Sequence, residues 1–201
     1  MTPDLLVSVL LVGFTLGLLH ALDPDHLITV ASLSARPDAN DATLRYAALW
    51  ALGHGGLLVA IAAAVMLLGW TLPEALPAGA EWTVGLILIG VGASALWLRH
   101  PPHGKRSNLR EKAPFAIGLI HGLAGSAAML ALIPVTLYRP AAGLAYAIVF
   151  SFGVLVGMMG FALVLDRVQH GLAARVPALQ RAVRLTLGIG AIGMGAYWLS
   201  A

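Results

Sequence analysis

Six long apolar segments dominate this sequence, and they limit the folds that it can adopt. Each contains roughly 17 residues or more, which is enough to cross the hydrocarbon core of a bilayer as a helix. Only 10% of the residues are charged, and a soluble protein of this size could not cover so much apolar surface. We therefore predict an all-α, polytopic membrane protein with six transmembrane helices, at about 5–34, 43–69, 82–98, 114–137, 141–165 and 182–199.

Lys and Arg are distributed very unevenly between the two sides of the predicted membrane domain. Eleven of the twelve follow the first, third or fifth span, and only Arg139 lies on the opposite side. Cytoplasmic loops of membrane proteins carry such an excess of basic residues. We therefore expect both termini on the non-cytoplasmic side. This placement also explains the pI of 9.7 without a nucleic-acid partner, for which there is no motif.

The two halves of the chain share a short similarity. Gly17-Leu-Leu-His20-Ala-Leu resembles Gly118-Leu-Ile-His121-Gly-Leu, and each half would hold three spans. An odd number of spans per half means that the halves insert in opposite orientations, as in many transporters. We therefore predict one transmembrane domain, 1–201, with two inverted three-helix repeats. Its parts are a first half (1–98), a basic cytoplasmic loop (99–113) and a second half (114–201).

The first span contains His20, Asp23, Asp25 and His26 within seven residues. An ionisable side chain in the hydrocarbon costs about 2.5–3.5 kcal/mol on insertion scales, so such residues usually mark a functional site. The alternative is a loop outside the membrane. The apolar run continues after His26, however, which favours a site inside the span.

Pro24 predicts a break in this first helix, at Asp23-Pro24. Proline removes a helical hydrogen bond and clashes with the carbonyl four residues earlier, here that of His20. In an unbroken helix His20 and His26 would lie about 240° apart around the axis and could not share a small ligand. A break allows the two side chains to converge.

Two further histidines, His54 and His121, lie inside the second and fourth spans. A single histidine in a span commonly hydrogen-bonds a neighbouring helix. These two, however, fall within about 10 Å of the depth of His20 and His26. We therefore expect one cavity, with Thr29, Ser126 and Ser151 as further polar lining. The predicted metal ligands are His20, Asp23, Asp25, His26, His54 and His121.

The tryptophans mostly lie near the ends of the predicted spans, as an interfacial aromatic belt would require. They are Trp50, Trp70, Trp82, Trp97 and Trp198.

Imidazole nitrogens with one or two carboxylates suit borderline divalent metals. Nickel, cobalt, zinc and copper(II) all fit this donor set, and the chain has no cysteine to supply a thiolate. Magnesium or calcium would require mainly oxygen ligands. We therefore expect no cofactor besides a transported metal ion.

The same residues resemble a known family. His20-x4-Asp25-His26 is similar to the His-x4-Asp-His signature of the nickel/cobalt transporter family, and Leu52-Gly53-His54 resembles its second motif. The stretch from His121 resembles the bacterial branch of high-affinity nickel transporters and urease-accessory proteins. Pro24 stands where many members have Ala, and Gly55 follows His54 in place of Ser or Thr. The resemblance implies Ni2+ or Co2+ transport across a bacterial inner membrane, with the motif residues as ligands.

Several functions remain open from the sequence. The first is a permease for a divalent transition metal, and the chain contains no ATP-binding motif to drive it. The alternatives are a proton-coupled carrier that uses the His and Asp residues as a proton relay, or a membrane subunit of a larger metal-uptake complex. We do not expect an enzyme. The expected partners are the lipid bilayer and the ion, with a homo-oligomer or an accessory subunit left open.

Overall fold

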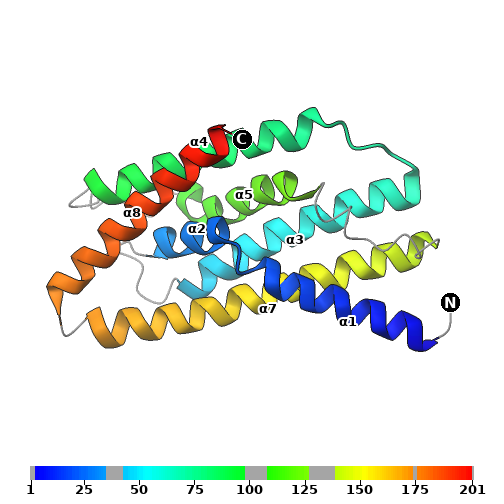
Figure 1. The fold of residues 1–201 in the computed structure, drawn as a ribbon, viewed down its shortest axis with the longest axis horizontal. Helices are drawn as coiled ribbons and strands as arrows, with labels where there is room; N and C mark the ends of the chain where they lie inside the picture. Colours follow the sequence, from blue (N-terminus) through cyan, green and yellow to red (C-terminus); the bar gives the residue numbers. More distant parts are fainter. Residues whose placement is uncertain (1–2, 35–42, 98–107, 127–138, 174–175, 201) are drawn as a thin grey trace.

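The computed structural model describes residues 3–34, 43–97, 108–126, 139–173 and 176–200. Every element that it assigns in these ranges is an α-helix (Figure 1). The helices are α1 (Pro3–His20), α2 (Pro24–Ser34), α3 (Thr43–Leu68), α4 (Ala75–Trp97), α5 (Asn108–Ala124), α7 (Pro140–Ala173) and α8 (Pro177–Ser200). The predicted all-α fold is confirmed for the described part of the chain.

The lengths and composition of these helices agree with a multi-pass membrane protein. Four segments could cross a membrane unaided: Thr43–Leu68, Ala75–Trp97, Pro140–Val168 and Arg181–Ser200. The pair Leu6–His20 and Pro24–Ser32 could form one more span, bent by 55° at its break. The remaining predicted span, 114–137, begins within α5, but its second half lies outside the described residues.

Proline and glycine set several helix boundaries. Proline is the first residue of α1, α2, α7 and α8. At this position its fixed φ suits the helix, and its missing N–H removes no intrahelical hydrogen bond. Helix α3 ends just before Gly69, whose φ of 65° is a left-handed conformation that glycine adopts without strain. The local sequence therefore determines where several spans start and stop.

The helices pack mainly in pairs. α1 lies along α7, α3 lies between α5 and α7, and α4 packs against α8 (Figure 1). The largest buried side chains of the main core include Trp50, Leu58, Tyr146, Phe150 and Met158. Many large apolar side chains on the outer faces are exposed, as expected of surfaces that face lipid; examples are Leu11, Leu52, Leu86, Phe152 and Ile189.

Glycine allows two of these helix pairs to approach very closely. A Cβ atom at Gly17 of α1 would collide with the carbonyl oxygen of Phe150 on α7. In the same way, a Cβ atom at Gly118 of α5 would collide with the carbonyl oxygen of Trp50 on α3. Small residues at helix interfaces permit such backbone contact in membranes. The contacts hold α1, α3, α5 and α7 together around the turn between α1 and α2.

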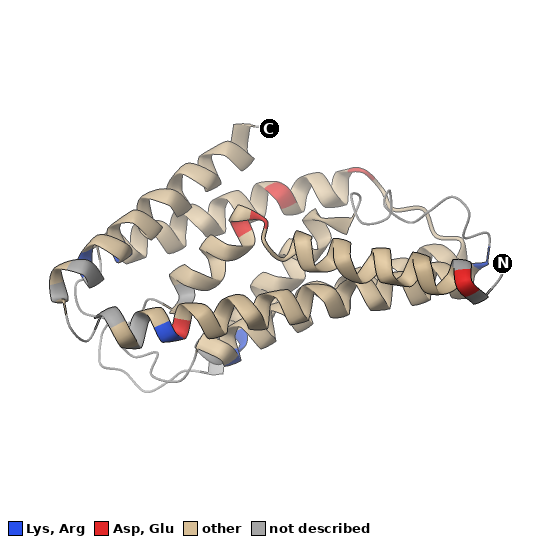
Figure 2. Ribbon diagram, turned by 60° about the horizontal axis from the view of Figure 1, so that its bottom comes forward, with Lys and Arg blue, Asp and Glu red and all other residues tan. Residues whose placement is uncertain are grey.

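The charged residues follow the ends of the helices. Figure 2 shows most described Lys and Arg residues at the end of the bundle where α7 ends and α8 begins. The start of α7 carries Arg139 at the opposite end. Between the two ends lie the acidic residues of the α1–α2 turn, Asp23 and Asp25. The turn therefore places two carboxylates in the middle of the bundle.

Candidate metal centre

The turn between α1 and α2 shapes the candidate site. α1 ends at His20 and α2 begins at Pro24, so the predicted break at Asp23-Pro24 is confirmed. The amide of Asp23 donates to the carbonyl of His20 (3.1 Å), and the carbonyl of Asp23 accepts from the amides of His26 (3.1 Å) and Leu27 (3.2 Å). These bonds satisfy the backbone where the helix is interrupted, which a break within a membrane requires.

Histidines from three helices meet beside this turn. The ring centroids of His20 and His26 are 4.7 Å apart, and those of His26 and His54 are 5.0 Å apart. Each of the three offers a nitrogen, and the three nitrogens lie within 4.8 Å of one another. Because metal–imidazole bonds measure about 2.0–2.1 Å, a small inward movement of the side chains would let them share one ion. We call these three residues the histidine triad.

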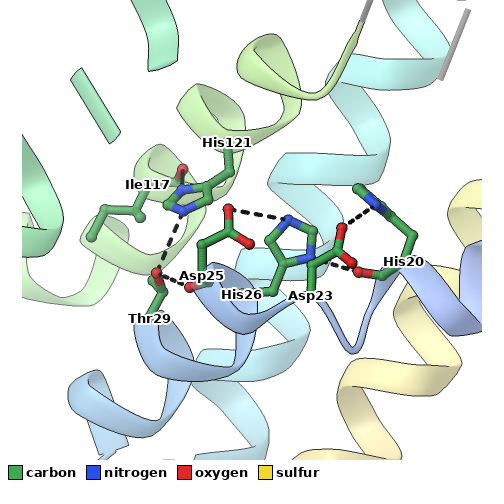
Figure 3. Close-up of polar contacts among 7 residues, drawn as sticks. All are labelled: His20, Asp23, Asp25, His26, Thr29, Ile117 and His121. Carbon is green, nitrogen blue, oxygen red and sulfur yellow. Dashed lines mark hydrogen bonds and ion pairs between the residues drawn. The ribbon is translucent and has the colours of Figure 1, made fainter. Parts of the chain in front are cut away.

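Hydrogen bonds fix which ring nitrogen is free in His20 and His26. His26 donates from Nδ1 to the carbonyl of His20 (3.0 Å), while His20 Nδ1 lies 2.7 Å from Asp23 Oδ2 (Figure 3). A carbonyl or carboxylate oxygen can only accept, so in the neutral ring the proton is on Nδ1 and the lone pair is on Nε2. Metal-binding histidines are oriented by such contacts at their other nitrogen.

His54 is fully buried, yet neither of its ring nitrogens has a hydrogen-bond partner among the described residues. Buried polar atoms almost always have partners, and an unpaired one costs about 1–3 kcal/mol. An imidazole without a partner, next to two imidazoles with free lone pairs, indicates a position prepared for a ligand.

Both aspartates of the turn approach His26. Asp23, Asp25 and His26 each offer an atom, and these three atoms also lie within 4.8 Å of one another. Asp25 Oδ2 is 3.9 Å from His26 Nε2. The Asp23 side chain is 48% exposed, whereas that of Asp25 is 13% exposed. His26 thus belongs to two groups of potential ligands, and the carboxylates supply the negative charge that attracts a divalent cation.

His121 lies beside the histidine triad rather than within it. Its ring centroid is 5.9 Å from that of His26, and its Nδ1 donates to the carbonyl of Ile117 (3.1 Å). Its Nε2 is 3.4 Å from Thr29 Oγ1, which donates to the carbonyl of Asp25 (2.7 Å) (Figure 3). The structure thus gathers all six predicted residues, with His121 on the Asp25 side.

Trp50 belongs to this site, and its predicted place in the interfacial belt is wrong. Its side chain is fully buried and stacks on His54, with ring centroids 4.9 Å apart and an interplanar angle of 17°. The indole also lies 4.8 Å from the ring of His26 and 5.4 Å from that of His121. Trp50 precedes His54 by four residues, so the spacing already places the two on one helix face.

The two predicted lining serines make other contacts. Ser151 donates to the carbonyl of Gly55 (3.2 Å) and so links α7 to α3 next to His54. Ser126 donates to the carbonyl of Leu123 (2.6 Å), at the end of α5. Both hydroxyls therefore bond to backbone carbonyls near the site.

These features define a class: a multi-pass helical membrane protein with buried histidines and two adjacent aspartates at a broken span. Residues 6–99 match the family described as high-affinity nickel-transport protein. The urease accessory protein UreH of Bacillus sp. (strain TB-90) is 32% identical over 171 residues, which cover 78% of this chain and 75% of that protein. The chain belongs to the high-affinity nickel-transport protein family.

More distant relatives occur in plants. The Arabidopsis thaliana chloroplast proteins FOR GROWTH AND FERTILITY 2 and 1 are 28% and 29% identical to this chain. The matches cover 91% of this chain in both cases, but only 54% and 56% of the plant proteins. The chain thus spans little more than half the length of these two relatives. No solved structure matches it significantly.

Proposed function

We propose that this protein is a membrane permease for Ni2+ or Co2+. The observation that carries the proposal is the meeting of His20, His26 and His54 from three helices, where both nitrogens of His54 are buried and have no partner in the described part of the chain. Membership of a nickel-transport family supports the same function. We assign His20, His26 and His54 as ligands, with Asp23, Asp25 and His121 as further ligands or their immediate support.

The donor set supports this choice of ion. Imidazole nitrogens with carboxylate oxygens favour borderline divalent metals over magnesium and calcium. Neither the family nor the relatives point to zinc or copper. The ion is cargo rather than a catalytic cofactor, so the protein acts as a transporter and not as an enzyme.

Two inverted halves of three spans, 1–98 and 114–201, form the proposed architecture, joined by the basic loop 99–113. Matching close contacts between the two halves support it. Gly17 meets the carbonyl of Phe150, and Gly118 meets that of Trp50. If the halves are inverted repeats, α1 of the first half corresponds to α5 of the second, and α3 corresponds to α7. The contact of α1 with α7 then corresponds to the contact of α5 with α3. Binding sites of such transporters lie at the interface of the repeats, near broken helices.

Further glycines repeat the pattern. A Cβ atom at Gly153 of α7 would collide with the carbonyl of Phe14 on α1, and one at Gly53 of α3 with that of Phe115 on α5. On the outer pair, Gly85 of α4 and Gly195 of α8 face each other's carbonyl oxygens. When the two halves are exchanged, the Gly153 contact corresponds to the Gly53 contact, and the Gly85–Gly195 pair corresponds to itself.

We further propose a bacterial inner membrane as the location, with both termini on the non-cytoplasmic side. The gathering of Lys and Arg at one end of the bundle supports this orientation (Figure 2).

Transport by the purified protein in liposomes tests the function. Vesicles that contain a metal-sensitive dye should take up Ni2+ faster than protein-free vesicles. His54→Ala should abolish this uptake, whereas Gly56→Ala should retain it, because Gly56 is exposed and a Cβ atom there would contact nothing within 4 Å.

The same assay separates the alternatives. Equal uptake by His54→Ala and the wild-type protein would refute the proposed site. Ni2+ binding without any uptake would indicate a subunit of a larger complex. Steep pH dependence without sensitivity to chelators would indicate a proton-coupled carrier of another solute.

A further inference from the structure

Helix α2 carries a narrow polar stripe that leads away from the histidine triad. Asp25, Thr29 and Ser32 are spaced i, i+4 and i+7, which places them on one face of the helix. From Asp25 to Ser32 the stripe rises by about 10 Å along the axis. Thr29 and Ser32 are only 1% and 3% exposed. The stripe is therefore enclosed by protein.

Ser32 is the least explained member of this stripe. Its hydroxyl is buried and has no hydrogen-bond partner among the described residues. Several other helical hydroxyls donate back to a carbonyl of their own helix, as Thr29 does to Asp25 and Thr83 does to Gly79. A buried hydroxyl that forgoes this bond is unfavourable unless water or an ion completes it.

A second group of potential ligands lies at the start of the stripe. His121 Nε2 is 3.4 Å from Thr29 Oγ1, and Asp25 Oδ2 is 3.9 Å from His26 Nε2. The carboxylate of Asp25 thus lies next to His26 of the histidine triad. The hydroxyl of Thr29 lies between the backbone carbonyl of Asp25 and the ring of His121. An ion that leaves the triad can exchange imidazole nitrogens for carboxylate and hydroxyl oxygens, with one imidazole retained. Oxygen donors hold borderline metals less tightly, which favours onward movement.

The stripe points to the basic end of the bundle. α2 starts at the break and runs to Ser34, and the next described helix, α3, starts at Thr43 and carries Arg45 in its first turn. The stripe therefore lies on the side of the site opposite to the start of α1.

We propose that Asp25, Thr29 and Ser32, together with His121, form a lane through which the divalent cation moves between the histidine triad and the basic end of the bundle. This inference rests on the proposed transport function and adds a path to its binding site. The lane is a transient second binding position rather than the site of highest affinity.

The first test separates binding from movement. Thr29→Val keeps the size of the side chain and removes the hydroxyl. Nickel affinity in detergent should change by less than about twofold, while the initial uptake rate in liposomes should fall by about tenfold, which is about 1.4 kcal/mol in the barrier. The matched control is Thr83→Val, which removes an equivalent hydroxyl that donates to Gly79 on an exposed face. Its affinity and its uptake rate should both stay unchanged.

The second test probes accessibility. The chain has no cysteine, so Ser32→Cys introduces a single thiol. A small, charged, membrane-impermeant thiol reagent should label it only from the side of the basic loops, and Ni2+ should slow the labelling. A folded variant that resists the reagent from both sides, with normal uptake by Thr29→Val, would overturn the lane.

Failure of the lane is distinguishable from failure of the proposed function. If His54→Ala abolishes uptake while Thr29→Val and Ser32→Ala transport normally, the lane is wrong and the permease stands. If the wild-type protein neither binds nor transports Ni2+, both proposals fall.

Discussion

Replacing Gly53 by alanine should separate α3 from α5 and weaken the metal centre. A Cβ atom at this position would collide with the carbonyl oxygen of Phe115 and lie 3.0 Å from the amide nitrogen of Leu119. Both are backbone atoms, so no side-chain rotation relieves the overlap. Because His54 follows Gly53 directly, any shift of α3 away from α5 also moves one of the three triad imidazoles.

Gly56→Ala on the same helix supplies the magnitude by comparison. Alanine gains about 0.8–1.0 kcal/mol of helix propensity over glycine, and this gain is common to both variants. At Gly56 nothing lies within 4 Å of the added atom, whereas at Gly53 it overpacks a helix interface. Overpacking typically costs about 1–3 kcal/mol. The propensity cancels, so Gly53→Ala should be less stable than Gly56→Ala by about 1–3 kcal/mol.

Reversible unfolding in mixed detergent micelles measures the difference, and calorimetric titration with Ni2+ measures the effect on the site. The expected order of stability is Gly56→Ala, wild type, then Gly53→Ala, with weaker nickel binding only in the last. Equal stability of the two variants would refute the close packing of α3 on α5.

Three more predictions concern the site itself. Asp23→Asn removes the carboxylate that lies 2.7 Å from His20 Nδ1, so nickel affinity should fall by about 10–100-fold in calorimetric titration. In a variant that keeps only Trp50 of the five tryptophans, Ni2+ should quench the fluorescence, because the indole lies 4.8 Å and 4.9 Å from the rings of His26 and His54; constant emission at saturating Ni2+ would contradict this placement. Nickel affinity should also fall once the pH is low enough to protonate the buried imidazoles, because imidazoles must be deprotonated to bind metal; an affinity that stays constant down to the pH at which the protein unfolds would argue against histidine ligands.

The sequence predicted those parts of the site that depend on a single helix. Pro24 predicted the break, because proline disrupts a helix wherever it falls inside one. The positions of His54 and His121 along their spans predicted a common depth, since the rise per residue is fixed. These local rules are independent of how the helices pack.

How side chains from different helices lie relative to one another depends on helix packing, which is harder to predict from the sequence. The rise per residue predicts a common depth for His121 and the histidine triad, yet His121 lies beside the triad: its ring centroid is 5.9 Å from that of His26, and its Nδ1 donates to the carbonyl of Ile117 on its own helix. Trp50 was assigned to the interface from its place near a span end. It is buried instead because α3 lies between α5 and α7, which cover the face of its first turns that carries Thr43, Ala47 and Trp50.

X-ray absorption at the nickel edge tests the central claim most directly, because it reports the atoms bound to the ion. We predict imidazole scattering from the three residues of the triad in the loaded wild-type protein, and one imidazole fewer in His54→Ala. Gly56→Ala should give the wild-type spectrum. A nickel ion surrounded only by oxygen, with the same spectrum in His54→Ala, would contradict the account.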